Sequence, residues 1–478
     1  MVFASSEFLW LFMPMVLLAY LAAPPRWRNG VLAALSLVFY AWGAHEALLI
    51  FVASITFNFG AGRLIHRFRD RGDERAVRRT MWIAVAANLS LLFFWKYAAF
   101  AVAQLDRALG LAGSDGVTVP HIALPIGISF FTFHGISYIV DITRGDAKPL
   151  RNPANYAQYM AFFPQLIAGP IVRYREIDDQ LLSPPPRSQR LDDFAEGFPR
   201  FALGLSKKVL IADPAGAVAD AAFATSGGEL TTASAWLGVF AYTVQIYFDF
   251  SGYSDMAIGL ARMFGLRFPE NFNRPYSAVS MTDFWRRWHM TLSRWFRDYL
   301  YIPLGGSRGS QSDTVRNLMV VFFLTGAWHG ASWTFIAWGV FHGLLLVGER
   351  LTGIRTWADD RRVLLRRAVT LILVMMGWAL FRADSFGQAA DFWRAMFVPS
   401  GDALPAAVHT ALNTETVLAL VAGLVSVLLP RSFVMGRALH GEWAGRPLLA
   451  RGFVLAVLPL AAITVAAGSF SPFLYFRF

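Results

Sequence analysis

The stretch that decides the fold is MWIAVAANLSLLFFWKYAAFAVA, from Met81 to Ala103. It is longer than the roughly 20 apolar residues that a helix needs to cross the hydrocarbon core of a bilayer. Similar runs recur between Phe8 and Ala467, although several are too short for a perpendicular span. We therefore predict an all-α, polytopic membrane protein with about ten to thirteen membrane segments, some of them re-entrant or interfacial.

The composition agrees with this fold class. Of the 478 residues, 56% are hydrophobic and 16% are charged, whereas soluble domains average roughly 45–50% and about 25%. The net charge is +11, but the Lys and Arg residues sit mainly in short loops, so membrane topology explains them better than nucleic-acid binding does. The chain has no cysteine, which excludes disulfides, thiolate metal sites and a cysteine nucleophile.

The basic residues also predict an orientation. Seven arginines lie between Arg63 and Arg79, and such loops stay on the cytoplasmic side. Counting back through three helices places the N-terminus outside, where Glu7 is the only charged residue before Arg26. We read Phe8–Ala23 as a retained first helix rather than a signal peptide. No soluble domain or tandem repeat interrupts the sequence, so we expect one membrane domain over 1–478.

The first candidate for chemistry is His329, in LTGAWHGASWTF. An ionisable side chain inside a membrane segment is costly and is therefore a functional candidate. Small neighbours such as Gly326 and Gly330 leave room for a substrate beside the imidazole. Apolar surroundings keep a histidine neutral, which is the form that a general base requires. The alternative is a structural histidine, hydrogen-bonded at a packed helix interface.

The second candidate stretch is MTDFWRRWHMTLSRWFRDYLYIPLGG, from Met281 to Gly306. Its arginines Arg286 and Arg287 suit a phosphorylated donor, and His289 follows them directly. Asp298 would either orient a histidine or pair with an arginine. The alternative is an interfacial amphipathic helix with snorkelling arginines and a tryptophan belt.

Two further stretches interrupt apolar runs. In QIYFDFSGYSDMAIG, Asp249 begins a polar cluster that lines a tunnel or forms a helix-to-helix turn. We favour the turn, with Ser254 or Asp255 as the N-cap. In FFPQLIAGPIVRY, the Pro and Gly residues from Pro164 to Pro170 predict a broken or re-entrant helix, with a simple kinked span as the alternative.

The other histidines are expected to be structural or solvated. His134 and His342 lie in apolar segments, and the rest lie near loops: His45, His66, His121, His409 and His440. No pair has a convincing metal spacing, and the motifs of metalloproteases, P-loop proteins and serine hydrolases are missing from the sequence. We therefore predict no metal site.

Taken together and in this order, six strings resemble the membrane-bound O-acyltransferase (MBOAT) superfamily, in the bacterial branch typified by the alginate O-acetyltransferase membrane subunit. They are LPIGISFFTFHGISYIVD, FFPQLIAGPIVRY, QIYFDFSGYSDMAIGLARMFG, PENFNRPY, DFWRRWHMTLSRWFRDYLYIPLGG and LTGAWHGASWTFIAWGVFHG. The matching core runs over 124–343, FASSEFLWLFMP and ALFRADSF also look familial, and the helices of 397–478 are less diagnostic.

The resemblance implies a ring of helices around a central tunnel, with His329 catalytic and His289 as the second key residue. An acyl donor enters from the cytoplasm, and an acceptor hydroxyl approaches from the far side. The residues that we expect to line the donor site or tunnel are Arg286, Arg287, Trp328, Asp298 and Asp249.

The resulting hypothesis is an O-acetyltransferase of the bacterial inner membrane that uses acetyl-CoA and holds no bound cofactor. His329 is the general base or carries a transient acyl group, and His289 orients the donor or stabilises an oxyanion. The acceptor is alginate or a similar exopolysaccharide, reached through a periplasmic SGNH-type partner; peptidoglycan and cellulose are alternatives. From other classes, a proton-coupled transporter with a His329–Asp249 relay and an export scaffold stay open.

Overall fold

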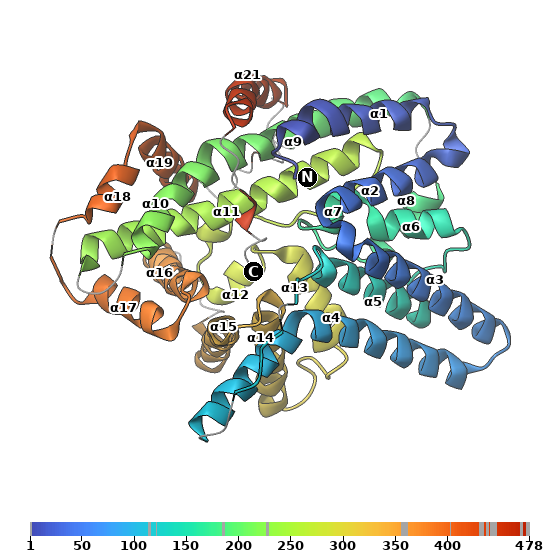
Figure 1. Ribbon diagram of the computed structural model, residues 1–478, viewed down its shortest axis with the longest axis horizontal. Helices are drawn as coiled ribbons and strands as arrows, with labels where there is room; N and C mark the ends of the chain where they lie inside the picture. The colour runs from blue at the N-terminus through green and yellow to red at the C-terminus, as the bar shows by residue number, and fades with distance from the viewer. Residues whose placement is uncertain are drawn as a thin grey trace. The chain divides into compact units, whose positions relative to one another are not determined.

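The computed structural model describes residues 2–112, 116–120, 122–183, 187–225, 229–354, 362–401, 403–429, 435, 439, 447–468 and 472–474. Every regular element in these ranges is helical (Figure 1), which confirms the all-α prediction. The chain divides into two compact units. The first contains Glu7–Ala195 and Leu260–Pro269, and the second contains Val2–Ser6, Glu196–Gly259 and Glu270–Phe478. The single domain over 1–478 stays a prediction.

The first unit holds the N-terminal helices, in which α2 packs on α6, and α3 packs on both α4 and α5. A reciprocal pair of amide hydrogen bonds, 3.1 and 2.8 Å long, joins Asn58 of α3 to Asn88 of α4. Such pairs satisfy polar side chains where water is absent. The elements of this unit are η1 (Phe8–Phe12), α1 (Met13–Ala22), η2 (Pro25–Trp27), α2 (Arg28–Ala44), η3 (His45–Ala47), α3 (Leu48–Asp70), α4 (Glu74–Leu111), α5 (Ile128–Arg144), α6 (Pro153–Ala161), α7 (Phe163–Leu166), η4 (Tyr174–Glu176), α8 (Asp178–Leu182), η5 (Arg187–Gln189) and the start of α9 (Arg190–Lys207).

The predicted break in FFPQLIAGPIVRY is confirmed. Helix α6 ends at Ala161, α7 lasts only from Phe163 to Leu166, and the backbone then stays non-helical as far as η4. Gly169 has a φ of +100°, a conformation that glycine adopts at little cost. The Pro and Gly residues that signalled the break therefore stand where the helix ends.

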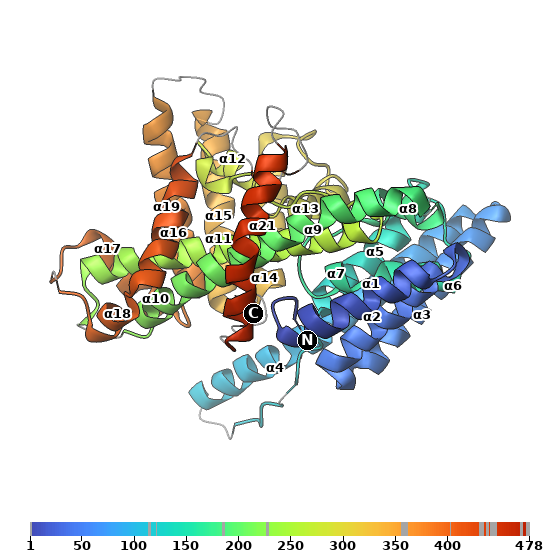
Figure 2. The same ribbon diagram turned by 90° about the horizontal axis from the view of Figure 1, so that it is seen from above.

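The second unit contains the remaining helices, and α10, α17 and α18 gather at one end of it (Figures 1 and 2). Its elements are the rest of α9, η6 (Lys208–Ala212), α10 (Asp213–Phe223), α11 (Thr232–Met263), η8 (Pro275–Ser277), α12 (Met281–Trp285), α13 (Met290–Phe296), η9 (Arg297–Tyr301), α14 (Gln311–His329), α15 (Trp333–Thr352), α16 (Val363–Arg382), α17 (Phe386–Phe397), α18 (Ala406–Ala411), α19 (Thr414–Leu428) and α21 (Pro447–Ala466).

Helix α11 corrects one prediction. It runs without interruption from Thr232 to Met263, so Ser254 and Asp255 lie inside a helix and are not N-caps. The expected turn was wrong because these polar residues have partners outside the helix. Asp255 pairs with Arg200 and Lys207 of α9, and the Ser254 hydroxyl accepts from the side chain of Asn271. A methyl group at Gly204 of α9 would collide with the α11 backbone at Gly252 and Met256, so the two helices approach closely here.

Three helical stretches among the described residues are long and apolar enough to cross a membrane: 25–70, 74–111 and 363–382. Shorter apolar helices cover Phe8–Ala22, Thr414–Leu428 and Val454–Ala466. The larger number of segments, about ten to thirteen, and their arrangement as a ring around a tunnel stay predictions.

Helices α14 and α15 form a hairpin whose backbones meet at two glycines. A methyl group at Gly326 would collide with the carbonyl oxygen of Phe335, and one at Gly339 with the carbonyl oxygen of Phe322. Backbone atoms cannot rotate away as a flexible side chain can, so neither position has room for a larger residue. The small residues around His329 are thus explained by helix packing as well as by space for a substrate.

We expect Gly339→Ala to destabilise the protein by roughly 1–3 kcal/mol, because it overpacks this contact. Gly348→Ala in the same helix is the matched control, since nothing lies within 4 Å of its added methyl group, and it should be neutral or slightly stabilising. Thermal unfolding in detergent measures both. Equal melting temperatures for the two variants would contradict the packing argument.

Candidate active site

His329 is the last residue of α14. The helix ends there because Gly330 is extended, with φ −162° and ψ 154°, and Ser332 then caps α15 by accepting a 3.1 Å hydrogen bond from the backbone N–H of Thr334. His329 is only 7% exposed. The centres of the Trp338 and Phe381 rings lie 5.1 and 5.3 Å from the centre of its imidazole, and both contacts are edge-on.

His329 lines a small pocket in the second unit. Only two of its lining residues are ionisable, His329 and Asp249, and most of the others are aromatic. The lining consists of Ile246, Asp249, Phe250, Trp288, His329, Trp338, Trp378, Phe381, Phe473 and Leu474. The pocket therefore presents the imidazole of His329 among mostly apolar side chains.

Asp249 is buried, and both of its carboxylate oxygens have a polar partner. Lys208 of η6 lies 2.8 Å from Oδ1, and the backbone N–H of Leu474 donates a 2.7 Å hydrogen bond to Oδ2. Lys208 also pairs with Asp213 at 2.6 Å. The sequence prediction that Asp249 lies near His329 agrees with the pocket lining, but Lys208 and Leu474 had no sequence signal, because both come from distant apolar segments.

His289 precedes α13 and has a left-handed backbone, with φ +41°. Its Nδ1 lies 3.1 Å from Oδ1 of Asn271. The ring centre is 4.7 Å from that of Phe250, which lines the pocket, and 6.2 Å from that of Trp328. His289 thus sits behind the pocket wall, outside the lining residues. Burial lowers its pKa from 6.5 to about 3, which keeps the imidazole neutral.

Trp328 is the side chain that connects the two histidines. It is buried, and its ring centre lies 5.0 Å from that of His329 and 6.2 Å from that of His289. The structure therefore brings together His329, Trp328 and Asp249 at or beside one pocket, with His289 one side chain away.

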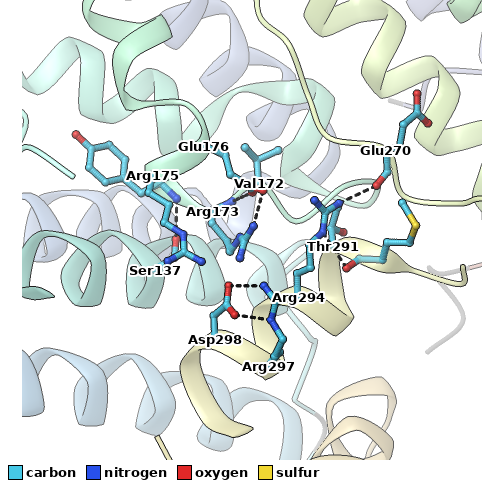
Figure 3. A network of polar contacts seen from close by, with 12 residues as sticks. Ser137, Val172, Arg173, Arg175, Glu176, Glu270, Thr291, Arg294, Arg297 and Asp298 are labelled. Atoms are coloured by element: carbon cyan, nitrogen blue, oxygen red, sulfur yellow. Dashed lines mark hydrogen bonds and ion pairs between the residues drawn. The ribbon is translucent and has the colours of Figure 1, made fainter. Parts of the chain in front are cut away.

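The charged residues of the second stretch lie elsewhere. Arg286 is exposed, and Arg287 donates to the Asp283 carboxylate at 2.7 Å. Asp298 accepts hydrogen bonds of 2.7 and 3.2 Å from Arg297 (Figure 3). Of the two options predicted for Asp298, this contact is the pairing with an arginine. None of the three predicted residues is part of the described pocket lining. Their roles as donor contacts stay predictions.

The sequence did not predict the aromatic wall of the pocket, which consists of Phe250, Trp288, Trp338, Trp378, Phe381 and Phe473. The indole N–H of Trp378 donates a 3.2 Å hydrogen bond to the Tyr276 hydroxyl, which in turn donates to the carbonyl oxygen of Thr243 at 2.7 Å. Tyr276 lies in PENFNRPY and Phe381 in ALFRADSF. Both strings contribute to the family resemblance, but nothing in the sequence assigned these two aromatic residues a role. An aromatic residue in an apolar run gives no sign of whether it faces lipid or a cavity.

Of the other histidines, His134 and His342 are fully buried, His45 and His409 are exposed, and His66 is half-buried. His121 and His440 lie outside the described residues. Among the residues that the structure does describe, no three His, Asp or Glu side chains converge as metal ligands do. The absence of a metal stays a prediction.

The family model described as "MBOAT, membrane-bound O-acyltransferase family" matches residues 146–381. A protein of Azotobacter vinelandii named probable alginate O-acetylase AlgI is 43% identical, over 100% of both chains. The chain belongs to the membrane-bound O-acyltransferase family. It is therefore a membrane protein and an O-acyltransferase, which confirms the predicted family, reaction class and membrane location.

Two further relatives of this membrane-bound O-acyltransferase have names that state an activity. A Pseudomonas aeruginosa protein, also named probable alginate O-acetylase AlgI, is 47% identical over 83% of this chain and 75% of its own. A Helicobacter pylori protein named peptidoglycan O-acetyltransferase is 35% identical over 84% of this chain and 81% of its own. The family match contains His289, His329 and most of the pocket lining, but Phe473 and Leu474 lie beyond it.

His289 lies outside the candidate membrane spans among the described residues. Its lowered pKa predicts how the free energy of unfolding depends on pH. Below pH 6.5 this histidine is protonated in the unfolded chain, whereas in the folded protein it stays neutral down to about pH 3. The free energy of unfolding should therefore fall as the pH drops through that window.

A His289→Gln variant lacks this contribution, so its stability should decline less on acidification. The difference should be about 1.4 kcal/mol per pH unit between roughly pH 6 and 4. Unfolding in detergent at several pH values measures it, with the exposed His409→Gln as a control that keeps the wild-type dependence. Parallel curves for wild type and His289→Gln would contradict the prediction.

Proposed function

We propose that this O-acyltransferase moves an acetyl group from cytoplasmic acetyl-CoA to hydroxyl groups of an extracytoplasmic polysaccharide, alginate or a similar exopolysaccharide. The observation that carries the proposal is the mostly apolar pocket in which His329 is the one imidazole among the described lining residues. The relatives named alginate O-acetylase, with 43–47% identity, support the acetyl group and the polymer.

In the proposed step, His329 takes the proton of the acceptor hydroxyl while the hydroxyl oxygen attacks the thioester carbonyl carbon. The carbon–sulfur bond breaks, and the leaving thiolate takes the proton back from the imidazolium. An ester and a free thiol are formed, and His329 returns to its neutral state. A route through an acyl-imidazole on His329 also balances and shares the same pocket.

The aromatic wall supports this role in two ways. It excludes water, which would otherwise compete with the acceptor hydroxyl for the thioester. It also makes the protonated imidazole costly, so the proton moves on to the leaving sulfur instead of staying on His329.

The proposed setting is the bacterial inner membrane, with the N-terminus in the periplasm and the arginines of 63–79 in the cytoplasm. Exposed Arg286 and its neighbour Arg287 would then meet the phosphates of the donor. A periplasmic SGNH-type protein would carry the acetyl group onward to the polymer.

Peptidoglycan is the second candidate acceptor, supported by the Helicobacter pylori relative. NMR of the O-acetyl groups on extracted polymers, from wild-type and deletion cells, separates it from alginate and from cellulose. Loss of acetyl groups from only one polymer identifies the acceptor. A transporter or an export scaffold would instead leave acetylation unchanged when His329 is replaced.

We expect His329→Ala to reduce acetyl transfer from radiolabelled acetyl-CoA by about 10²–10⁴-fold, because the general base is lost. Membranes with matched expression levels measure the transfer into polymer. The exposed His409→Ala serves as the control and should keep wild-type transfer. Near-normal turnover in His329→Ala would remove this residue from the mechanism.

A further inference from the structure

The side chain of Asn271 is fully buried beside His289, and its orientation is fixed. The backbone N–H of Thr291 donates to its Oδ1 at 3.3 Å, and the Thr291 hydroxyl donates to the same oxygen at 2.8 Å. A backbone N–H can only donate, so the atom that it meets must be the amide oxygen. The amide nitrogen, on the other side, donates to the Ser254 hydroxyl of α11 at 3.0 Å.

This orientation decides where the proton of His289 sits. Its Nδ1 lies 3.1 Å from Oδ1 of Asn271, and that oxygen can only accept, so Nδ1 must carry the hydrogen. A neutral imidazole has a single N–H, which leaves Nε2 with a free lone pair. In the part of the chain that the structure describes, Nε2 is buried and has no hydrogen-bond partner.

Two backbone hydrogen bonds join the segment that contains His289 to the segment that contains Asn271. The N–H of Met290 donates to the Asn271 carbonyl, and the N–H of Asn273 donates to the Arg287 carbonyl, both at 2.9 Å. Between these bonds, His289 adopts a left-handed φ of +41°, a strained conformation that persists only where the surroundings impose it. Such strain is found mainly at functional sites.

We propose that Asn271 is a positioning residue that locks His289 in the Nδ1–H form, so that Nε2 accepts a hydrogen bond from a substrate hydroxyl group. The inference rests on the proposed function. A neutral His289 in this form has no free N–H, so it cannot stabilise an oxyanion by donation. This form of His289 rules out the predicted oxyanion stabilisation, and it adds a role that the sequence did not suggest, orientation of the acceptor alcohol.

His289 is fully buried and lies outside the described pocket lining, so a substrate hydroxyl group reaches Nε2 only when the side chains that cover it move. Its ring packs on Phe250, which forms part of the pocket wall, and on Trp328, the neighbour of His329. An alcohol held between the two histidines would give one hydrogen bond to Nε2 of His289 and its reacting proton to His329. A hydroxyl group has one hydrogen, so in a polyol such as a sugar the two contacts come from neighbouring hydroxyls.

Substitutions of Asn271 separate positioning from simple support. Asn271→Asp keeps an oxygen that accepts from Nδ1 and Thr291, and should retain kcat within about tenfold of wild type. Asn271→Leu removes the acceptor at similar volume and should lower kcat on the order of 10²–10⁴-fold. Asn58→Leu, which breaks a buried amide pair far along the chain from the site, is the control: melting temperature should fall while kcat is kept.

Nitrogen-15 NMR of histidine-labelled protein in detergent reads the tautomer directly, and the His289→Gln variant identifies the signals. We expect a protonated Nδ1 and an unprotonated Nε2 in wild type, and loss of that pattern in Asn271→Leu. A proton on Nε2 in wild type, or full kcat in Asn271→Leu, would overturn the inference. If wild type transfers no acetyl group at all, the proposed function fails, while the NMR result still tests the tautomer.

Discussion

The contact between the backbones of α14 and α15 at Gly326 and Gly339 is the constraint on which the site depends. It brings the C-terminal end of α14, with His329, against the face of α15 that carries Trp338. Neither side chain alone makes a reaction site. Their meeting requires two helices closer than ordinary side chains allow, and glycine at both positions makes this approach possible.

Elsewhere in the second unit, charged residues of α9 pair with a carboxylate of α11. Arg200 and Lys207 of α9 both lie 2.6 Å from the Asp255 carboxylate of α11, and Arg200 also reaches Glu270 at 2.8 Å. Removing one partner of such a pair strands a charge in a medium that cannot solvate it, at a cost of about 3–5 kcal/mol. These pairs tie α9 to α11, the helix that supplies Asp249 and Phe250 to the pocket.

How much the sequence predicts depends on how local the cause is. The buried place of His329 and the broken segment before Tyr174 were predictable, because a polar residue in an apolar run and a Pro–Gly interruption act at their own positions in the chain. Ser254 and Asp255 were misjudged as caps, because their partners lie on α9 and near Asn271, which are remote in sequence. The aromatic wall of the pocket was not predicted either, because the same aromatic residue types face lipid and line cavities.

The pocket wall is not drawn from one continuous part of the chain. Phe473 and Leu474 stand far downstream of the region shared across the family, yet they border the same space as His329. The cavity is therefore shaped by two parts of the chain that are remote in sequence. A substitution at Phe473 or Leu474 changes the shape of the cavity and leaves His329 in place.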